Sequence, residues 1–114
     1  MILKVMINGQ EIPVNVPADL VDDAETFFLK MDSDMSKGWQ MSKDWVDEPN
    51  LEQRCQIAAD RLLSAIHNDN TSVATMMAAY IMARMPGTVR VVVDTQGEIQ
   101  ETHFEQGDPH AMDS

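Results

Sequence analysis

Residues 71–87 read TSVATMMAAYIMARMPG, and we predict that this stretch forms the helix around which the rest of the chain folds. Across 73–85 the polar groups are too few to make a water-facing side, so the pattern is not that of an amphipathic surface helix. Its alanines favour a helix, a polar residue among 70–72 can cap the start, and Pro86 with Gly87 ends it. At about 1.5 Å per residue it spans roughly 22 Å, less than a bilayer core of about 30 Å. We therefore expect a core helix and not a membrane span.

The composition limits the kinds of partner that the protein can have. The chain has 114 residues, of which 44% are hydrophobic, and this suits one globular domain. Lys and Arg number 8 against 19 Asp and Glu, giving a formal net charge of -11. Such a charge repels nucleic acid and anionic lipid and favours a basic partner. The single cysteine, Cys55, and an opening too short for a signal peptide predict a cytoplasmic protein.

The first hairpin is predicted from its turn. Asn8-Gly9 is the preferred dipeptide of a two-residue type I′ turn. Pairing about this turn sets Val5 opposite Ile12, so that apolar side chains share one face. Pro13 then falls where its missing N–H would have pointed away from the first strand, which indicates an edge strand.

The remaining elements follow from apolar spacing. Helical periods predict one helix from about Asp19 to Met31 and another over residues 51–66, while residues 88–94 and 98–105 read as a second hairpin. We expect an α+β fold with topology ββαααββ, in which two antiparallel hairpins form a four-stranded sheet of order 2-1-3-4 packed on three helices. Residues 1–105 form the single domain, and the polar tail 106–114 is expected to fray.

The segment 35–50, MSKGWQMSKDWVDEPN, has no sustained period and contains both tryptophans of the chain. Connections of this length without secondary structure tend to be functional or mobile. An alternative is a short irregular strand over residues 37–42.

Three residues of this segment are the candidate partner-binding residues: Trp39, Met41 and Trp45. Tryptophan and methionine are enriched at the cores of protein interfaces, and tryptophan is a frequent hot spot. The competing interpretation is that both indoles fold back over the open face of the sheet, where three apolar side chains would otherwise be exposed: Ile2, Met6 and Val92.

Two metal-binding patterns are considered and not favoured. Residues 32–36 begin like a calcium loop, but Lys37 and Lys43 stand where the loop needs a glycine and a bidentate glutamate. Thioether pairs could bind copper(I) with help from Cys55 or a histidine, namely Met31 with Met35 and Met82 with Met85. Methionine is also an efficient filler of irregular core space, which explains these positions without a metal. We expect neither a metal nor a cofactor.

A catalytic constellation is not found in the sequence. Cys55 falls on the apolar face of its predicted helix, and His67 is about 18 Å away along the helix axis. We therefore expect a non-catalytic protein that acts as an adaptor or regulatory module by protein-protein association. A metal-handling protein using methionine or acidic clusters is the second hypothesis, and a small enzyme is the third.

We also expect a homodimer. A helix as apolar as 71–87 needs cover on every side, and one face of the predicted sheet has none except the segment 35–50. An isologous contact would let an apolar patch cover its own copy. The interface is expected at the core helix or at the outer face of the sheet.

Overall fold

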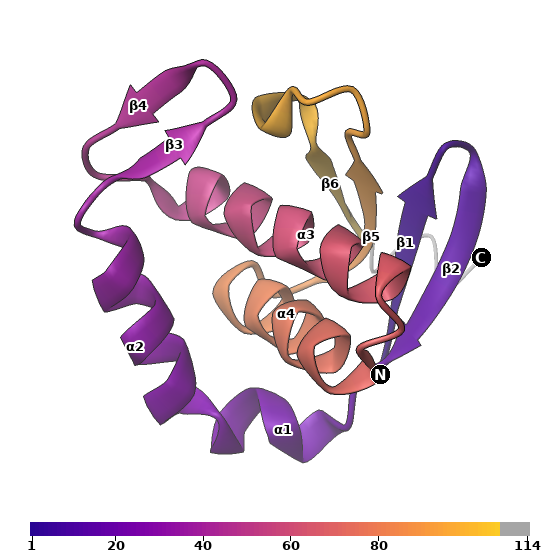
Figure 1. Cartoon of the computed structure of the whole chain (residues 1–114). Coiled ribbons are helices and arrows are strands. Elements are labelled where there is room, and N and C mark those ends of the chain that lie inside the picture. The colour runs from indigo at the N-terminus through magenta and orange to yellow at the C-terminus, as the bar shows by residue number, and fades with distance from the viewer. Residues whose placement is uncertain (108–114) are drawn as a thin grey trace.

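The structure is a computed structural model that describes residues 1–107. In chain order, its elements are β1 (Ile2–Ile7), β2 (Gln10–Asn15), α1 (Ala18–Asp23), α2 (Glu25–Met35), β3 (Trp39–Met41), β4 (Asp44–Val46), α3 (Leu51–His67), α4 (Thr71–Arg84), β5 (Thr88–Val93), the 3-10 helix η1 (Ile99–Glu101) and β6 (His103–Gln106). Helices α3 and α4 lie side by side against the main sheet, while α1 and α2 wrap around their far side (Figure 1). The β3–β4 hairpin lies beyond one end of α3.

The main sheet has the order β2-β1-β5-β6. The first hairpin has the predicted register, with Val5 opposite Ile12, and β2 is an edge strand. Asn8 and Gly9 both have positive φ, 52° and 80°, as a type I′ turn requires. The two central strands, β1 and β5, run parallel, so the long connection between them has room for the helices.

The α+β class is confirmed, but the expected detail of four strands, three helices and topology ββαααββ is wrong. Within residues 1–107 there are four α-helices, and two additional strands form a sheet of their own, so the main sheet reads 2-1-5-6 and not 2-1-3-4 in chain numbering. The second hairpin is interrupted by η1. Before η1, the Asp94 carboxylate accepts a hydrogen bond from the Glu98 amide at 2.6 Å and holds the chain in a turn.

The predicted helix from Asp19 to Met31 is also corrected. The chain leaves helical geometry at Ala24, with φ -92° and ψ 15°, and α2 then continues to Met35. Acidic residues near a helix C-terminus are unfavourable for the macrodipole. Here Asp32 is compensated by side chains of α3 and α4, described below, and Met35 is buried in the core.

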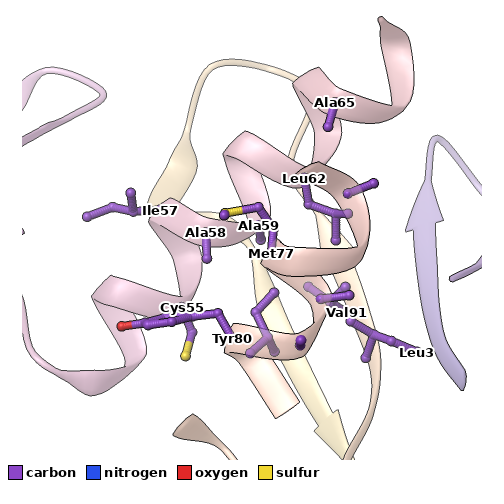
Figure 2. Packing of buried hydrophobic residues seen from close by; sticks show 14 of the residues in the cluster. Leu3, Cys55, Ile57, Ala58, Ala59, Leu62, Ala65, Met77, Tyr80 and Val91 are labelled. Carbon is purple, nitrogen blue, oxygen red and sulfur yellow. The ribbon is translucent and has the colours of Figure 1, made fainter. Parts of the chain in front are cut away.

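The core helix α4 matches the prediction closely. The Asn70 side chain accepts the Val73 amide at 3.2 Å and caps its start, and Gly87 follows its end with φ 89°. Figure 2 shows side chains of α3 and α4 gathered with Leu3 and Val91 of the two central strands. Leu62 and Met77 are fully buried in this cluster. One chain therefore covers most of α4, and a dimer is not needed to bury it.

Within residues 1–107, no helix lies on the outer face of the main sheet. Ile2 is 56% exposed, while Met6 and Val92 are half-buried. Arg90 lies on this face and pairs with Glu11 of one edge strand and Glu105 of the other, at 3.5 and 3.4 Å. None of the helices within residues 1–107 is both long and apolar enough to cross a bilayer.

Candidate functional site

The segment 35–50 forms a hairpin where the sequence shows no clear element. β3 and β4 pair antiparallel, with Gln40 opposite Trp45. Two backbone positions with positive φ allow it: Gly38 at 101°, where the chain leaves α2, and Ser42 at 58°, in the turn. The Gln40 side-chain amide donates to the Ser42 carbonyl at 2.9 Å and tightens this turn.

The indole of Trp45 is exposed and yet held in place. Its side chain is 58% exposed. The ring packs over Gly38 so closely that a Cβ at position 38 would lie 2.3 Å from Trp45 Cζ2. The indole Nε1–H donates to Asp47 Oδ1 at 2.9 Å. These two contacts fix one face and the polar edge of the ring, leaving much of the indole in solvent.

The other two candidates lie on the opposite side of the hairpin. Met41 is fully buried and belongs to the core, so it offers no exposed surface to a partner in this structure. Trp39 is half-buried and packs against the core. Alternation along β3 explains this, because Trp39 and Met41 share the inward face while Gln40 and its partner Trp45 point outward.

The indoles do not cover the outer face of the main sheet. Trp39 instead lines a cavity of about 290 Å³ together with Leu63 of α3 and Ile99 of η1. The hairpin turn is joined to this second wall by a hydrogen bond, since the Ile99 amide donates to Ser42 Oγ at 2.8 Å. Neither indole covers the apolar side chains on that face, where Ile2 is exposed and Met6 and Val92 are half-buried.

The cavity beside Trp39 is acidic. Among the described residues that line it, three carry carboxylates, Asp60, Asp94 and Glu98, and none is basic. Burial raises the pKa of the Asp60 carboxyl above its ordinary value. The carboxylates of Asp60, Asp94 and Glu98 give the cavity a negative charge, so it favours a positively charged group. In the neighbouring hairpin segment the exposed carboxylates Asp44, Asp47 and Glu48 outnumber the exposed lysines at positions 37 and 43, which leaves a small net charge of the same sign.

A second cluster of charged groups joins α2 to α3 and α4 around Asp32. The Tyr80 hydroxyl donates to Asp32 Oδ1, and Arg84 Nε donates to Asp32 Oδ2 at 3.0 Å. Arg84 also holds Glu25 with both terminal nitrogens, at 3.1 and 2.9 Å. Burial, followed by the bond to Asp32, raises the pKa of Tyr80, and the hydrogen bonds to Glu25 contribute most to the raised pKa of Arg84.

The groups of this cluster hold the helices together and are not arranged as a reactive site. Both oxygens of Asp32 already accept hydrogen bonds, and the Arg84 guanidinium lies 5.8 Å from the centre of the Phe28 ring and 5.5 Å from that of Tyr80. Nearby Cys55 is fully buried, and burial raises the pKa of its thiol to about 12. A thiol that stays protonated at neutral pH is a poor nucleophile and a poor metal ligand.

The groups considered for metal binding are placed as follows. Met31 and Met35 are buried in the core, and Met82 and Met85 are half-buried against it. His103 Nε2 lies 3.8 Å from Glu105 on the outer face of the sheet. Across residues 1–107 there is no group of three or more His, Cys, Asp or Glu side chains placed to hold a metal ion. The histidine at position 110 lies outside the described residues.

The sequence singles out Asp32 only as the start of the calcium-loop pattern, because its acidic neighbours are otherwise typical of a turn that ends a helix. The sequence signal that could reveal these contacts of Asp32 lies in α4. Tyr80 and Arg84 carry two of its few polar groups, and their spacing of four residues places both donors on one helical face. A buried pair of donors implies an acceptor on another element.

Comparisons with protein-family models, with curated proteins and with solved structures found no match to this chain.

Proposed function

We propose that the protein acts without catalysis, by binding another protein through the β3–β4 hairpin with Trp45 as the central contact. The observation that carries this proposal is an indole that is 58% exposed but fixed by Gly38 and Asp47. An exposed tryptophan supplies a large apolar surface to an interface. Because its contacts already restrict the ring, little side-chain entropy is lost when a partner covers it.

The partner that fits this surface is basic. Three carboxylates flank Trp45 in the chain against one lysine, Lys43, and the cavity beside Trp39 is acidic as well; the carboxylates are those of Asp44, Asp47 and Glu48. An arginine or lysine of the partner can stack on the open indole face while the carboxylates neutralise its charge. Electrostatic attraction to a chain of net charge -11 also accelerates encounter, so the association should weaken as salt is added.

The metal-handling and enzymatic hypotheses gain no support from residues 1–107. Their best candidate groups are a cysteine with a raised pKa, methionines in the core and a carboxylate engaged by side chains of two other helices. A free thiol at Cys55 suits a reducing compartment, and we place the proposed association in the cytoplasm.

A deca-arginine peptide is a suitable probe of this proposal, with deca-glutamate as the charge control. Wild-type protein is compared by calorimetry with Trp45→Ala and with Leu29→Ala, since Leu29 on α2 is also 58% exposed. We expect Trp45→Ala to weaken deca-arginine binding about tenfold or more, the scale of a hot-spot residue, and Leu29→Ala to leave it within about twofold. Equal affinities of the two variants would contradict the role of Trp45.

A further inference from the structure

Arg54, on the first turns of α3, contacts both ends of the segment that carries the hairpin. Its Nε donates to the Pro49 carbonyl at 2.9 Å, where the chain enters α3. Its Nη2 donates to Ser36 Oγ at 3.0 Å, where the chain leaves α2. Its Nη1 lies 3.6 Å from Asp32 Oδ1, and the side chain is 25% exposed. One guanidinium thus joins the entry and the exit of residues 36–49.

We infer that Arg54 is a positioning residue for Trp45. This inference rests on the proposed function, because the position of Trp45 matters only if that indole is the contact. A two-stranded hairpin of such short strands is marginal by itself and needs to pack against other elements. Its turn is held by the bond between Ile99 and Ser42, and its base is held by Arg54.

The chemistry of this position requires arginine. The three acceptors belong to a backbone carbonyl, a hydroxyl and a carboxylate, and each is reached by a different nitrogen of the guanidinium. Lysine would keep the charge opposite Asp32, but a single ammonium on a flexible stem cannot hold Pro49 and Ser36 in the same planar geometry. Charge alone is therefore insufficient.

The loss of Arg54 should act locally. The bond to the Ser36 hydroxyl is exposed, so water can replace the guanidinium there, whereas the bond to the Pro49 carbonyl is partly buried. The Asp32 carboxylate keeps its bonds to Tyr80 and Arg84, so α2 stays joined to α4. The expected consequence is a fold that persists while the base of the hairpin loosens and Trp45 gains motion.

The experiment uses full-length protein carrying Trp39→Phe, so that Trp45 is the only indole. Into this background are placed Arg54→Lys, Arg54→Gln and the control Arg61→Gln, which changes an exposed arginine of the same helix. The measurements are the fluorescence anisotropy of Trp45, amide hydrogen exchange of β3 and β4, and deca-arginine affinity. We expect both Arg54 variants to lower the anisotropy, to accelerate exchange in the hairpin about tenfold without changing α4, and to weaken peptide binding. Arg61→Gln should match its background protein.

The outcomes separate this inference from the proposed function. If Arg54→Lys has the same anisotropy and hydrogen exchange as the Trp39→Phe background protein, the positioning role is overturned, whatever the affinity. Loosening of the hairpin with unchanged deca-arginine affinity would support the positioning role and contradict Trp45 as the contact. If Arg54→Gln fails to fold, as judged by circular dichroism, Arg54→Lys alone decides, because it keeps the charge opposite Asp32.

Discussion

The ring of Trp45 occupies the space beside Gly38 that any other residue would need for its Cβ, 2.3 Å from Trp45 Cζ2. Gly38 also has a φ of 101°, a conformation that residues with a side chain rarely adopt. The glycine therefore serves two purposes: it allows the chain to leave α2, and it gives the exposed indole a flat surface to pack on.

Gly38→Ala should consequently displace the indole and strain the backbone. We expect a loss of about 1 to 2 kcal/mol in the free energy of unfolding from the backbone conformation. The matched control is Gly97→Ala, where φ is 84° and nothing lies within 4 Å of the added Cβ. Urea unfolding and Trp45 fluorescence measure the two effects. A shift in tryptophan emission in both variants, or in neither, would show that the contact between Trp45 and Gly38 does not fix the ring.

Asp32→Asn tests the cluster that holds α2. The substitution removes the charge that Tyr80 and Arg84 bind, and we expect a loss of about 2 kcal/mol in the free energy of unfolding. Asp34→Asn changes an exposed carboxylate two residues away and should stay within about 0.5 kcal/mol of wild type. Urea unfolding at neutral pH compares the two. Equal stabilities would mean that the charge of Asp32 contributes little.

Asp60→Asn should stabilise the protein and weaken its binding. The Asp60 side chain is largely exposed, but partial burial of its carboxyl raises the pKa, so its ionised form opposes folding weakly. Its contribution to stability is present below the ordinary pKa of 3.8 and is lost as the pH rises through the raised value. Asparagine stays uncharged, so the variant should be more stable than wild type at neutral pH, and the difference should shrink toward acid. Urea midpoints measured across this pH range provide the test, and a variant less stable than wild type at neutral pH would oppose it.

The expected effect of Asp60→Asn on binding follows from the position of Asp60 in the wall of the cavity beside Trp39. If Asp60 helps to attract a basic partner, Asp60→Asn should reduce deca-arginine affinity while raising stability, a combination that general damage to the fold cannot produce. Calorimetry with the same peptide measures the affinity. Unchanged affinity would exclude Asp60 from the binding surface and leave the hairpin as the contact.

The homodimer stays a prediction, now restricted to the outer face of the sheet because α4 is covered within one chain. Sedimentation equilibrium should give about twice the chain mass of 12.8 kDa. Ile2→Glu places a charge on the 56% exposed residue of that face and should return the mass to one chain. A mass of 12.8 kDa for the wild type at all concentrations would rule the dimer out.

Local signals in the sequence predict the first hairpin and the core helix because each depends on neighbouring residues. Asn8 with Gly9 determines the turn of the first hairpin. Asn70 caps the start of the core helix, and Gly87 follows its end. The β3–β4 hairpin depends on positive φ at Gly38 and at Ser42, and serine gives no sign of such a conformation. The outward and inward faces of this hairpin cannot be assigned without its turn, so the sequence does not show that Met41 lies on the buried face.

The contacts of the charged cluster around Asp32 cannot be predicted from the sequence for a different reason. Tyr80 and Asp32 are 48 residues apart, and their contact exists only after α2 folds back onto α4. Arg54 likewise binds Ser36 across 18 residues. Helical periodicity identifies which face of an element is apolar, but it does not say which polar group on another element will lie opposite.

The central claim is that this protein associates with another protein through Trp45, and quantitative capture from the cells that express it tests this most directly. Wild-type, Trp45→Ala and Leu29→Ala proteins are immobilised at equal density after circular dichroism has shown that all three fold, and the retained proteins are quantified by mass spectrometry. We predict at least one basic protein whose recovery falls about tenfold or more with Trp45→Ala, is unchanged with Leu29→Ala and declines with added salt. Identical recovery profiles for the three proteins would contradict the claim.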